Sequence, residues 1–398
     1  MAEVMDKKAG SKTKGDAEGQ AEKPARKAGE KVAIFKASAG DLLKALQKIS
    51  GGAGRNKTLP ILGHVLIAKD GSSLRFTATD MEQQLSVETE LGASAGKTTV
   101  TADMRKLMDI LKAISPDVLT TMVSDGVKSQ ITAGKSKFTV GSLEATDFPL
   151  MQEATFDAAV MLKQGTLRTM IDDVSYAMAV HDVRYYLMGM LLETDGKSVF
   201  AVATDGSRLA MAEALLEKDA AKRGIILPGR AVHEMSKLLS DGAEEVELRL
   251  SGNQASMTMG DVRLVTKLIE GKFPDYRRVV PANIKKSVTF EREQLSQALR
   301  RAALMTEERF KGVRMKFKTN ELTLAVENTQ GESVSEMIGI DYEGEEIDLG
   351  MNVAFLADAV DNVTGDTVTL GLRSGLDSIL ITQEKNPNFR GVVMPMRV

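Results

Sequence analysis

A set of sequence landmarks recurs three times along this chain and constrains its fold more than any other feature. The segment Leu74–Asp80 (LRFTATD) returns as Val199–Asp205 (VFAVATD) and, more faintly, as Leu322–Asn328 (LTLAVEN). A Phe-Pro step at Phe148–Pro149 returns at Phe273–Pro274. The landmarks therefore recur at an interval of about 125 residues.

Two further landmarks keep the same order. Met394–Pro395 takes the place of the Phe-Pro step near the C-terminus, and a helix-like segment centred on Ala45 returns at Met170 and Ala298. Chance could supply any one landmark, but all of them in one order predict three copies of a domain of roughly 120 residues. Because this period far exceeds the roughly 20–50 residues of solenoid repeats, each copy should have its own core.

Each copy has the pattern of two amphipathic helices and several antiparallel strands. The Asp70–Gly71 and Asp195–Gly196 pairs predict tight turns of β-hairpins. A second helix is predicted in every copy from apolar residues at helical spacing: Met104, Leu107, Leu111 and Ile114; Val232, Met235 and Leu239; Val353, Leu356, Val360 and Val363. Two helices on antiparallel sheet, repeated three times, form an α+β architecture.

Open sheets leave unpaired strand edges on every copy. Successive copies can pair edge to edge within the chain, which leaves one edge on the first copy and one on the last. Joining these two edges between chains is a head-to-tail contact, and such contacts close into rings or grow into filaments. The pattern thus predicts an oligomeric ring; the alternative is a monomer kept apart by polar edge residues.

Composition excludes several classes of chemistry. The 398 residues include no cysteine and only three histidines, so disulfides, thiolate sites and His-based metal centres are not expected, and no cofactor is predicted. Ser207 lacks the G-x-S-x-G context of a nucleophile, and the chain has no P-loop and no G-x-G-x-x-G. Because no catalytic motif is found, the chain is expected not to be an enzyme. No apolar run reaches about 18 residues and no signal peptide is evident, which predicts a cytoplasmic protein.

The net charge of −3 argues against global attraction to nucleic acid but allows a locally basic channel. If the helices faced inward in a ring, basic residues on their polar faces would line a hole complementary to phosphates: Lys44, Lys48, Arg105, Lys112, Arg168, Arg230, His233, Lys237, Arg300 and Arg301. Asp358 and Asp361 would make that lining uneven. A solvated helix face is the alternative for all of them.

Six motifs resemble those of one protein family. They are TLPILGHVLIA (Thr58–Ala68), HDVRYYLMGMLLE (His181–Glu193), ATDGSRLA (Ala203–Ala210), FPDYRRVVP (Phe273–Pro281), FKGVRM (Phe310–Met315) and VVMPMRV (Val392–Val398). In this order and spacing they are similar to the beta sliding clamp family, the beta subunit of the bacterial DNA polymerase III holoenzyme. The resemblance covers about Val32 to Val398.

The resemblance implies three clamp domains per subunit and two subunits head to tail in a closed ring around double-stranded DNA. It implies a non-catalytic processivity factor that tethers the polymerase catalytic subunit, the clamp loader and repair proteins through short peptide motifs. The predicted boundaries are 1–31 for a disordered extension, then 32–153, 158–281 and 284–398 for clamp domains. The alternative from a different class is a modular protein-binding scaffold that does not encircle DNA.

The resemblance also assigns residues to three sites. The partner-peptide pocket comprises Leu187, Thr204, Gly206, Arg208, Leu209, Pro274, Arg278, Val279, Ser378, Val392, Met394, Pro395, Met396 and Arg397. The DNA contacts are Arg55, Lys57, His181, Arg184, Tyr185 and Tyr186. The subunit contact is made by Phe138, Val140, Leu304, Met305 and Phe310.

The C-terminus supports the pocket independently, because most chains finish in polar residues whereas this one finishes in the largely apolar Val392–Val398. Such a terminus needs a partner surface; alternatively it merely completes a sheet. Two departures from the family pattern are Asn56, where an arginine is common, and Met188, where an asparagine is common.

Overall fold

The computed structural model describes residues 29–54, 58–93, 96–284, 286–308 and 310–398. Residues 1–28, which make up most of the predicted N-terminal extension, lie outside this set, and so do Arg55 and Lys57 of the predicted DNA contacts.

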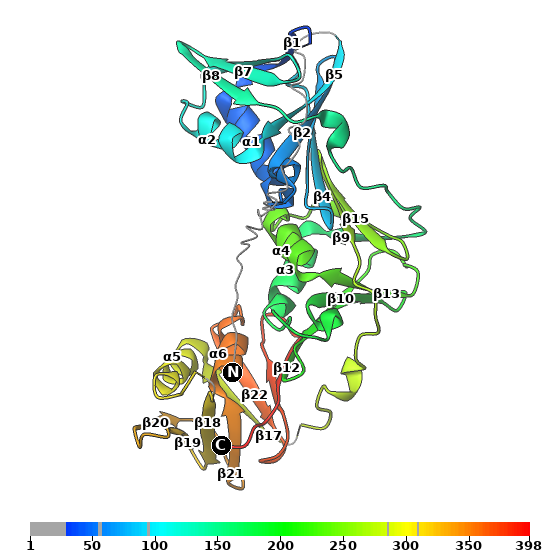
Figure 1. Ribbon diagram of the computed structural model, residues 1–398. Helices are drawn as coiled ribbons and strands as arrows, with labels where there is room; N and C mark the ends of the chain where they lie inside the picture. The colour runs from blue at the N-terminus through cyan, green and yellow to red at the C-terminus, as the bar shows by residue number, and fades with distance from the viewer. Residues whose placement is uncertain (1–28, 55–57, 94–95, 285, 309) are drawn as a thin grey trace, which may run out of the picture.

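The described chain consists of three copies of one ten-element pattern (Figure 1). The first copy contains β1 (Val32–Ser38), α1 (Ala39–Ile49), β2 (His64–Asp70), β3 (Ser73–Thr79), β4 (Gln83–Thr89), β5 (Lys97–Asp103), α2 (Met104–Lys112), β6 (Leu119–Ser124), β7 (Lys128–Ala133) and β8 (Ser136–Gly141). The second contains β9 (Ala158–Lys163), α3 (Gln164–Ser175), β10 (Gly189–Thr194), β11 (Ser198–Thr204), β12 (Arg208–Leu215), β13 (Arg223–Pro228), α4 (Gly229–Leu238), β14 (Glu245–Leu250), β15 (Gln254–Met259) and β16 (Val262–Lys267). The third contains β17 (Lys286–Glu291), α5 (Arg292–Ala303), β18 (Gly312–Lys318), β19 (Glu321–Glu327), β20 (Ser333–Gly339), β21 (Ile347–Asn352), α6 (Val353–Asp361), β22 (Thr367–Leu372), β23 (Ile379–Thr382) and β24 (Phe389–Val393). The predicted α+β class and the threefold repetition are confirmed.

Local sequence accounts for these elements. In α1, the Ser38 side chain accepts a hydrogen bond from the Asp41 backbone amide, which caps the helix, and Leu42, Leu46 and Ile49 turn one buried face to the sheet. The second helices end slightly earlier than predicted. Leu239 and Val363 follow the last helical residue yet remain buried, because the chain continues over the same core.

The two Asp-Gly turns lie where they were predicted. Gly71 and Gly196 have φ angles of +63° and +112°, which L side chains rarely adopt, and they connect the hairpins β2–β3 and β10–β11.

Edge-to-edge strand pairing joins the copies, as predicted. One eight-stranded sheet runs β5-β2-β3-β4-β16-β15-β14-β9 across the first and second copies, and another runs β13-β10-β11-β12-β24-β23-β22-β17 across the second and third. Each joint pairs the fourth strand of one copy with the last strand of the next copy. The backbone hydrogen bonds of a continuous sheet therefore hold neighbouring copies together.

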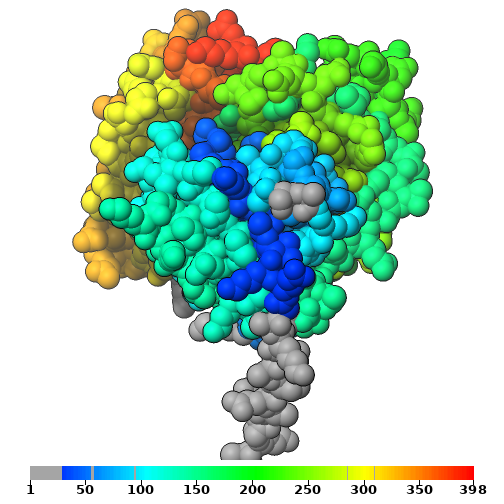
Figure 2. All heavy atoms as spheres, turned by 90° about the horizontal axis from the view of Figure 1, so that it is seen from above, coloured from blue at the N-terminus to red at the C-terminus, as the bar shows by residue number. Residues whose placement is uncertain are grey.

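Among the described residues, one last strand and one fourth strand have no partner in another copy. They are β8, the last strand of the first copy, and β20, the fourth strand of the third copy, and each ends a four-stranded sheet. The chain is curved, with its helices on the concave side and with β8 and β20 toward its two ends (Figure 1). Seen from above the first copy, the second and third copies extend to opposite sides behind it (Figure 2).

Polar side chains reinforce the joint between the second and third copies. The Asn362 amide donates to the backbone oxygens of Asp172 and Asp173, at 3.1 Å each, and the Asn386 amide donates to the Asp173 carboxylate at 2.6 Å. Asp173 is 2% exposed. Burial raises the pKa of Asp173 to about 7, against the opposing effect of the Asn386 hydrogen bond.

We predict that the free energy of unfolding falls as the pH rises from about 4 to about 7. Folded Asp173 keeps its proton in this range whereas the unfolded side chain, with its ordinary pKa of 3.8, releases it, so rising pH increasingly favours the unfolded state. Each unit of pKa difference contributes about 1.4 kcal/mol. Urea unfolding at several pH values measures this, and Asp173→Asn should flatten the profile.

Asp366→Asn is the control, because the Asp366 side chain is 96% exposed and is not among the groups that shift the pKa of Asp173. An unchanged profile in Asp173→Asn, or an equal flattening in both variants, would contradict the assignment to Asp173.

Candidate peptide pocket and nucleic-acid interface

The predicted peptide pocket lies at the joint between the second and third copies. There β12 pairs with β24, so that Leu209 faces Val392 in register and Arg208 faces Val393. Leu209 and Val392 are buried in one small apolar cluster, and Val279 packs against it. Strand pairing thus brings together pocket residues from distant parts of the sequence.

The turn between β11 and β12 forms one side of this region. Thr204 Oγ1 donates to the Arg208 backbone oxygen at 2.6 Å and accepts from the Gly206 amide at 3.0 Å. Gly206 has a φ of +92°, and a Cβ atom at this position would lie 3.0 Å from Arg184 Nη1. Both the backbone conformation and the close guanidinium therefore require glycine here.

The C-terminal tail runs across the end of the β12–β24 pair. The Met394 amide donates to the Ser207 oxygen and the Met396 amide to the Gly350 oxygen, both at 2.9 Å, while Pro395 forms a bridge to β21. Met394, Pro395 and Met396 remain half-buried. Both interpretations of the apolar terminus thus describe part of it: the tail adds to a sheet, and it keeps accessible apolar surface.

The other predicted pocket residues differ in accessibility. Leu187 is buried beneath the surface, Ser378 is half-buried at the start of β23, and Pro274, Arg278 and Arg397 are exposed. Apolar contact from Pro274 and donors from the two arginines are therefore available to a ligand, whereas Leu187 acts from below.

Arg208, which the resemblance assigns to the peptide pocket, has little accessible surface for a ligand. Its side chain is only 11% exposed, and its guanidinium pairs with Asp205 at 3.0 Å and with Asp358 of α6. The guanidinium carbon also lies 5.5 Å from the Tyr176 ring centroid and 4.7 Å from that of Phe355. Its donors are thus largely used inside the protein, where Arg208 connects β12 to α6.

Tyr176, Phe355 and Asp358 were not assigned to the pocket from the sequence. Helical periodicity marks Asp358 as a surface position of its helix and gives no sign that an arginine from another copy reaches it. Packing of α3 on β12 brings Tyr176 to Arg208 within the second copy, whereas Phe355 and Asp358 reach it from α6 of the third copy across the β12–β24 joint.

Arg184, a predicted DNA contact, is anchored beside the same turn. Its guanidinium donates to both Asp182 carboxylate oxygens, at 3.0 and 2.8 Å, and to the Asp205 backbone oxygen at 3.0 Å. The hydrogen bonds from Arg184 lower the pKa of Asp182 to about 2. Nearly half of the Arg184 side chain remains exposed, so a phosphate can still reach it.

The other predicted DNA contacts of this loop differ in their exposure. His181 and Tyr185 are exposed, and Tyr186 is half-buried against the apolar cluster of the joint. The two tyrosine rings meet edge to face, with centroids 6.0 Å apart. The loop therefore offers one accessible aromatic ring supported by a second ring that is held in place.

The basic residues predicted on helix faces lie on α1 to α5, along the concave side of the chain. Many are neutralised within the protein: Lys48 lies 2.6 Å from Asp261, Arg300 lies 2.9 Å from Asp361, and Arg230 lies 2.6 Å from Asp80. Because these pairs are partly solvated, they reduce the positive potential of the concave side without abolishing it.

Of the predicted subunit-contact residues, Phe138 and Val140 lie on the unpaired edge strand β8, whereas Leu304, Met305 and Phe310 lie between α5 and β18 of the third copy. On β8, Val140 is buried and Phe138 is half-buried in the core of its own copy. Near the end of α5, Leu304 is 77% exposed and Phe310 is 47% exposed, and Met305 packs partly against the core. Met337 on β20, 70% exposed, was missed from the sequence although it alternates with half-buried residues along that strand.

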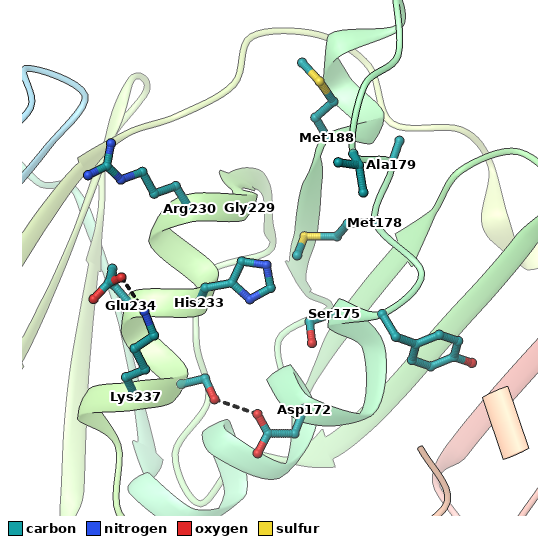
Figure 3. Close-up of a pocket in the computed structure, with 13 residues that line it drawn as sticks. Asp172, Ser175, Met178, Ala179, Met188, Gly229, Arg230, His233, Glu234 and Lys237 are labelled. Atoms are coloured by element: carbon teal, nitrogen blue, oxygen red, sulfur yellow. Dashed lines mark hydrogen bonds and ion pairs between the residues drawn. The ribbon is translucent and has the colours of Figure 1, made fainter. Parts of the chain in front are cut away.

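A hollow of about 800 Å³ lies between α3 and α4 (Figure 3). His233 projects into it from α4, facing Met178 and Ser175. Within the described ranges, no group of three or more acidic, histidine or cysteine side chains could hold a metal ion, and no helix is long and apolar enough to cross a bilayer.

Comparison with known families decides what this architecture is. The sequence matches the N-terminal, central and C-terminal domains of the DNA polymerase III beta subunit over residues 34–152, 161–275 and 277–397. The chain belongs to the DNA polymerase III beta subunit family, the DNA sliding clamps. The family resemblance and the sliding-clamp function predicted from the sequence are therefore confirmed.

Individual relatives agree over nearly the whole chain. Beta sliding clamps of Pseudomonas putida and Escherichia coli are 37% and 33% identical over 359 residues, which covers 90% of this chain and 98% of each relative. A crystal structure of the Pseudomonas aeruginosa clamp with ligand superposes with a TM-score of 0.88 at 35% identity, covering 92% of this chain and 100% of that one. A Caulobacter crescentus clamp gives a TM-score of 0.85 at 28% identity, with the same coverage.

We predict that Arg208→Ala lowers the free energy of unfolding by roughly 1–3 kcal/mol, because it leaves Asp205 and Asp358 without their cation and removes contacts with two aromatic rings. Urea unfolding measures the change. Arg278→Ala is the control, since Arg278 is 86% exposed and its ion pair with Asp275 is local. Equal effects of the two substitutions would contradict the structural role of Arg208.

Proposed function

We propose that two chains associate head to tail, β8 of each pairing with β20 of the other, to close a ring of six copies around double-stranded DNA. The observation that carries this proposal is the identity of the two unpaired edges. In both joints within the chain, the fourth strand of one copy pairs with the last strand of the next copy. Among the described residues, β20 is the one fourth strand and β8 the one last strand without such a partner. A third joint of the same geometry would unite them between chains.

The proposed ring acts as a non-catalytic processivity factor. Its helices would face the DNA, because they lie on the concave side of the chain. Contacts to phosphates without base readout allow the ring to move along DNA of any sequence. The proposed domains span residues 32–153, 158–281 and 284–398, and the proposed location is the cytoplasm, where the chromosome is replicated.

The proposed DNA contacts are His181, Arg184, Tyr185 and Tyr186, together with Arg55 and Lys57. The first four belong to the loop that precedes β10, next to the concave-side helices α3 and α4. Arg184 and Tyr185 keep accessible guanidinium and ring surface for phosphate and sugar.

We predict a dimer of twice the 43.0 kDa chain mass that stays on circular DNA after loading and is lost from linear DNA through its free ends. Light scattering and retention of labelled protein on the two DNA forms measure this. Leu304→Ser with Phe310→Ser should give folded monomers that neither DNA retains, because each apolar side chain buried in the contact contributes about 1.5–3 kcal/mol.

Leu215→Ser is the matched control, because Leu215 is as exposed as Leu304, at 77%, but lies away from both unpaired edges. Equal loss of the wild-type protein from circles and linear DNA would favour a protein-binding scaffold that does not encircle DNA. A double variant that remains dimeric at micromolar concentration would show that the subunit contact lies elsewhere.

We further infer that the pocket at the β12–β24 joint binds short peptide segments of the polymerase catalytic subunit, the clamp loader and repair proteins. Half-buried Met394 and Met396 would form an adaptable floor, Pro395 would stiffen it, and Pro274 and Val279 would form apolar walls. Arg278 and Arg397 would offer donors at the rim, whereas Arg208 would position the pocket from beneath.

Deletion of Met394–Val398 is predicted to weaken binding of a peptide that contains glutamine and large apolar residues by tenfold or more, about 1.4 kcal/mol. The dimer should persist, with a modest loss of thermal stability, because the hydrogen bonds to Ser207 and Gly350 disappear. Fluorescence anisotropy measures the affinity, and Met81→Ala serves as an exposed-methionine control outside the pocket and outside β20. Unchanged affinity after the deletion would contradict the pocket assignment.

A further inference from the structure

The hollow between α3 and α4 has the size and lining of a ligand site. Its volume of about 800 Å³ falls within the usual range of small-molecule pockets. It is lined by Asp172, Ser175, Tyr176, Met178, Ala179, Val180, Met188, Gly229, Arg230, His233, Glu234, Ser236 and Lys237. Both helices lie on the concave side of the chain, so the hollow is near the hole of the proposed ring (Figures 1 and 3).

The charged groups around the hollow are mostly balanced. Lys237 lies 2.8 Å from Glu234, and Arg230 pairs with Asp80. Both cations are still more than half exposed, at 68% and 52% of their side chains, so they can also meet a phosphate at the rim. The hollow therefore suits a ligand with an uncharged part inside and a single negative charge near its edge.

The inner groups suit a flat heterocycle. Half-buried Met188 and the 7% exposed Met178, which belongs to the core behind the hollow, line it with thioether groups, and such groups make favourable contacts with aromatic faces. The exposed His233 ring and the half-buried Ser175 hydroxyl both line the hollow and can exchange hydrogen bonds with the edge of such a ring. Asp172 accepts from Ser236 Oγ at 2.6 Å, and its second carboxylate oxygen lies 3.6 Å from Arg168 Nε, so this carboxylate is held in place at the side of the hollow.

A nucleobase combines these requirements, because it has two apolar faces and an edge of donors and acceptors. A base within a duplex is stacked and paired, so only an unpaired base can leave the strand and enter a lateral pocket. Tyr185, which is 53% exposed and precedes Met188 by three residues, offers a ring on which a neighbouring base can stack.

We propose that this hollow binds one unpaired nucleotide of a DNA single strand, with the base between Met178 and Met188, its edge at His233, and the phosphate near Arg230 or Lys237. The inference rests on the proposed passage of DNA along the concave side. It adds a grip on single-stranded DNA to a ring whose other DNA contacts ignore base identity.

The test measures binding of a fluorescein-labelled ten-nucleotide single strand, and of a duplex of equal length, to the full chain at one fixed salt concentration. His233→Glu should weaken single-strand binding at least fivefold and weaken duplex binding no more than Lys44→Glu does, because both residues lie on the concave side. The substitution is compatible with folding, because His233 is exposed on the helix surface. The methyl resonances of Met178 and Met188 should shift with the single strand and remain in place with the duplex.

Lys44→Glu is the control for general electrostatics. Lys44 is 78% exposed on α1 and is not part of the lining of the hollow, and its substitution replaces a positive charge with a negative one. Single-strand binding that is unchanged in His233→Glu, or that falls in parallel with duplex binding in both variants, would overturn the proposal. Loss of single-strand binding on deletion of Met394–Val398 would also overturn it, because the strand would then occupy the peptide pocket.

Two further measurements separate the possible outcomes. Methyl shifts produced by free deoxyadenosine monophosphate but not by the single strand would show that the hollow takes a free nucleotide, which also contradicts the proposal. Retention on circular DNA is measured in parallel with His233→Glu. Failure of the wild-type protein to remain on circles would remove the proposed ring function, while the oligonucleotide data would still decide whether the hollow binds a nucleotide.

Discussion

Main-chain hydrogen bonding between strand edges is the interaction on which the rest of this molecule depends. Each copy has its own helices and core, but its sheets end in edges that would otherwise expose unpaired amides and carbonyls. Pairing β4 with β16 and β12 with β24 satisfies these groups and fixes the curvature of the chain. The proposed peptide pocket depends on the second of these joints, which sets Leu209 opposite Val392.

One turn of five residues links the two kinds of proposed contact. Arg184, from the loop assigned to DNA, donates to the Asp205 backbone oxygen, and Arg208 pairs with the Asp205 carboxylate. The same turn accepts the Met394 amide at Ser207. A displacement of this turn would therefore move a DNA-side arginine, a helix of the third copy and the C-terminal tail together, whereas surface loops usually move alone.

Much of the fold could be predicted from the sequence, because repetition, helical periodicity and Asp-Gly turns are local signals that recur three times. The sequence predicts that strand edges of neighbouring copies pair, because open edges require partners. It does not predict which residues lie opposite each other in these pairs. The environment of Arg208 shows why: Tyr176 and Phe355 are far from it in sequence, and nothing in their own segments indicates a shared cation. Asp173 is buried where Asn386 and Asn362 of the third copy contact it. The sequence pattern around Asp173 does not reveal this contact, because its partners lie in another copy.

The unequal connection of the joints has a mechanical consequence for the proposed ring. A peptide linker keeps the partners of the two internal joints at a high effective concentration, so these joints re-form at once after any transient separation. The β8–β20 joint has no such tether, and its strands diffuse apart once they separate. Even if all joints had the same strand pairing, the joint between chains would have the shortest lifetime. The ring would therefore open at the β8–β20 joint.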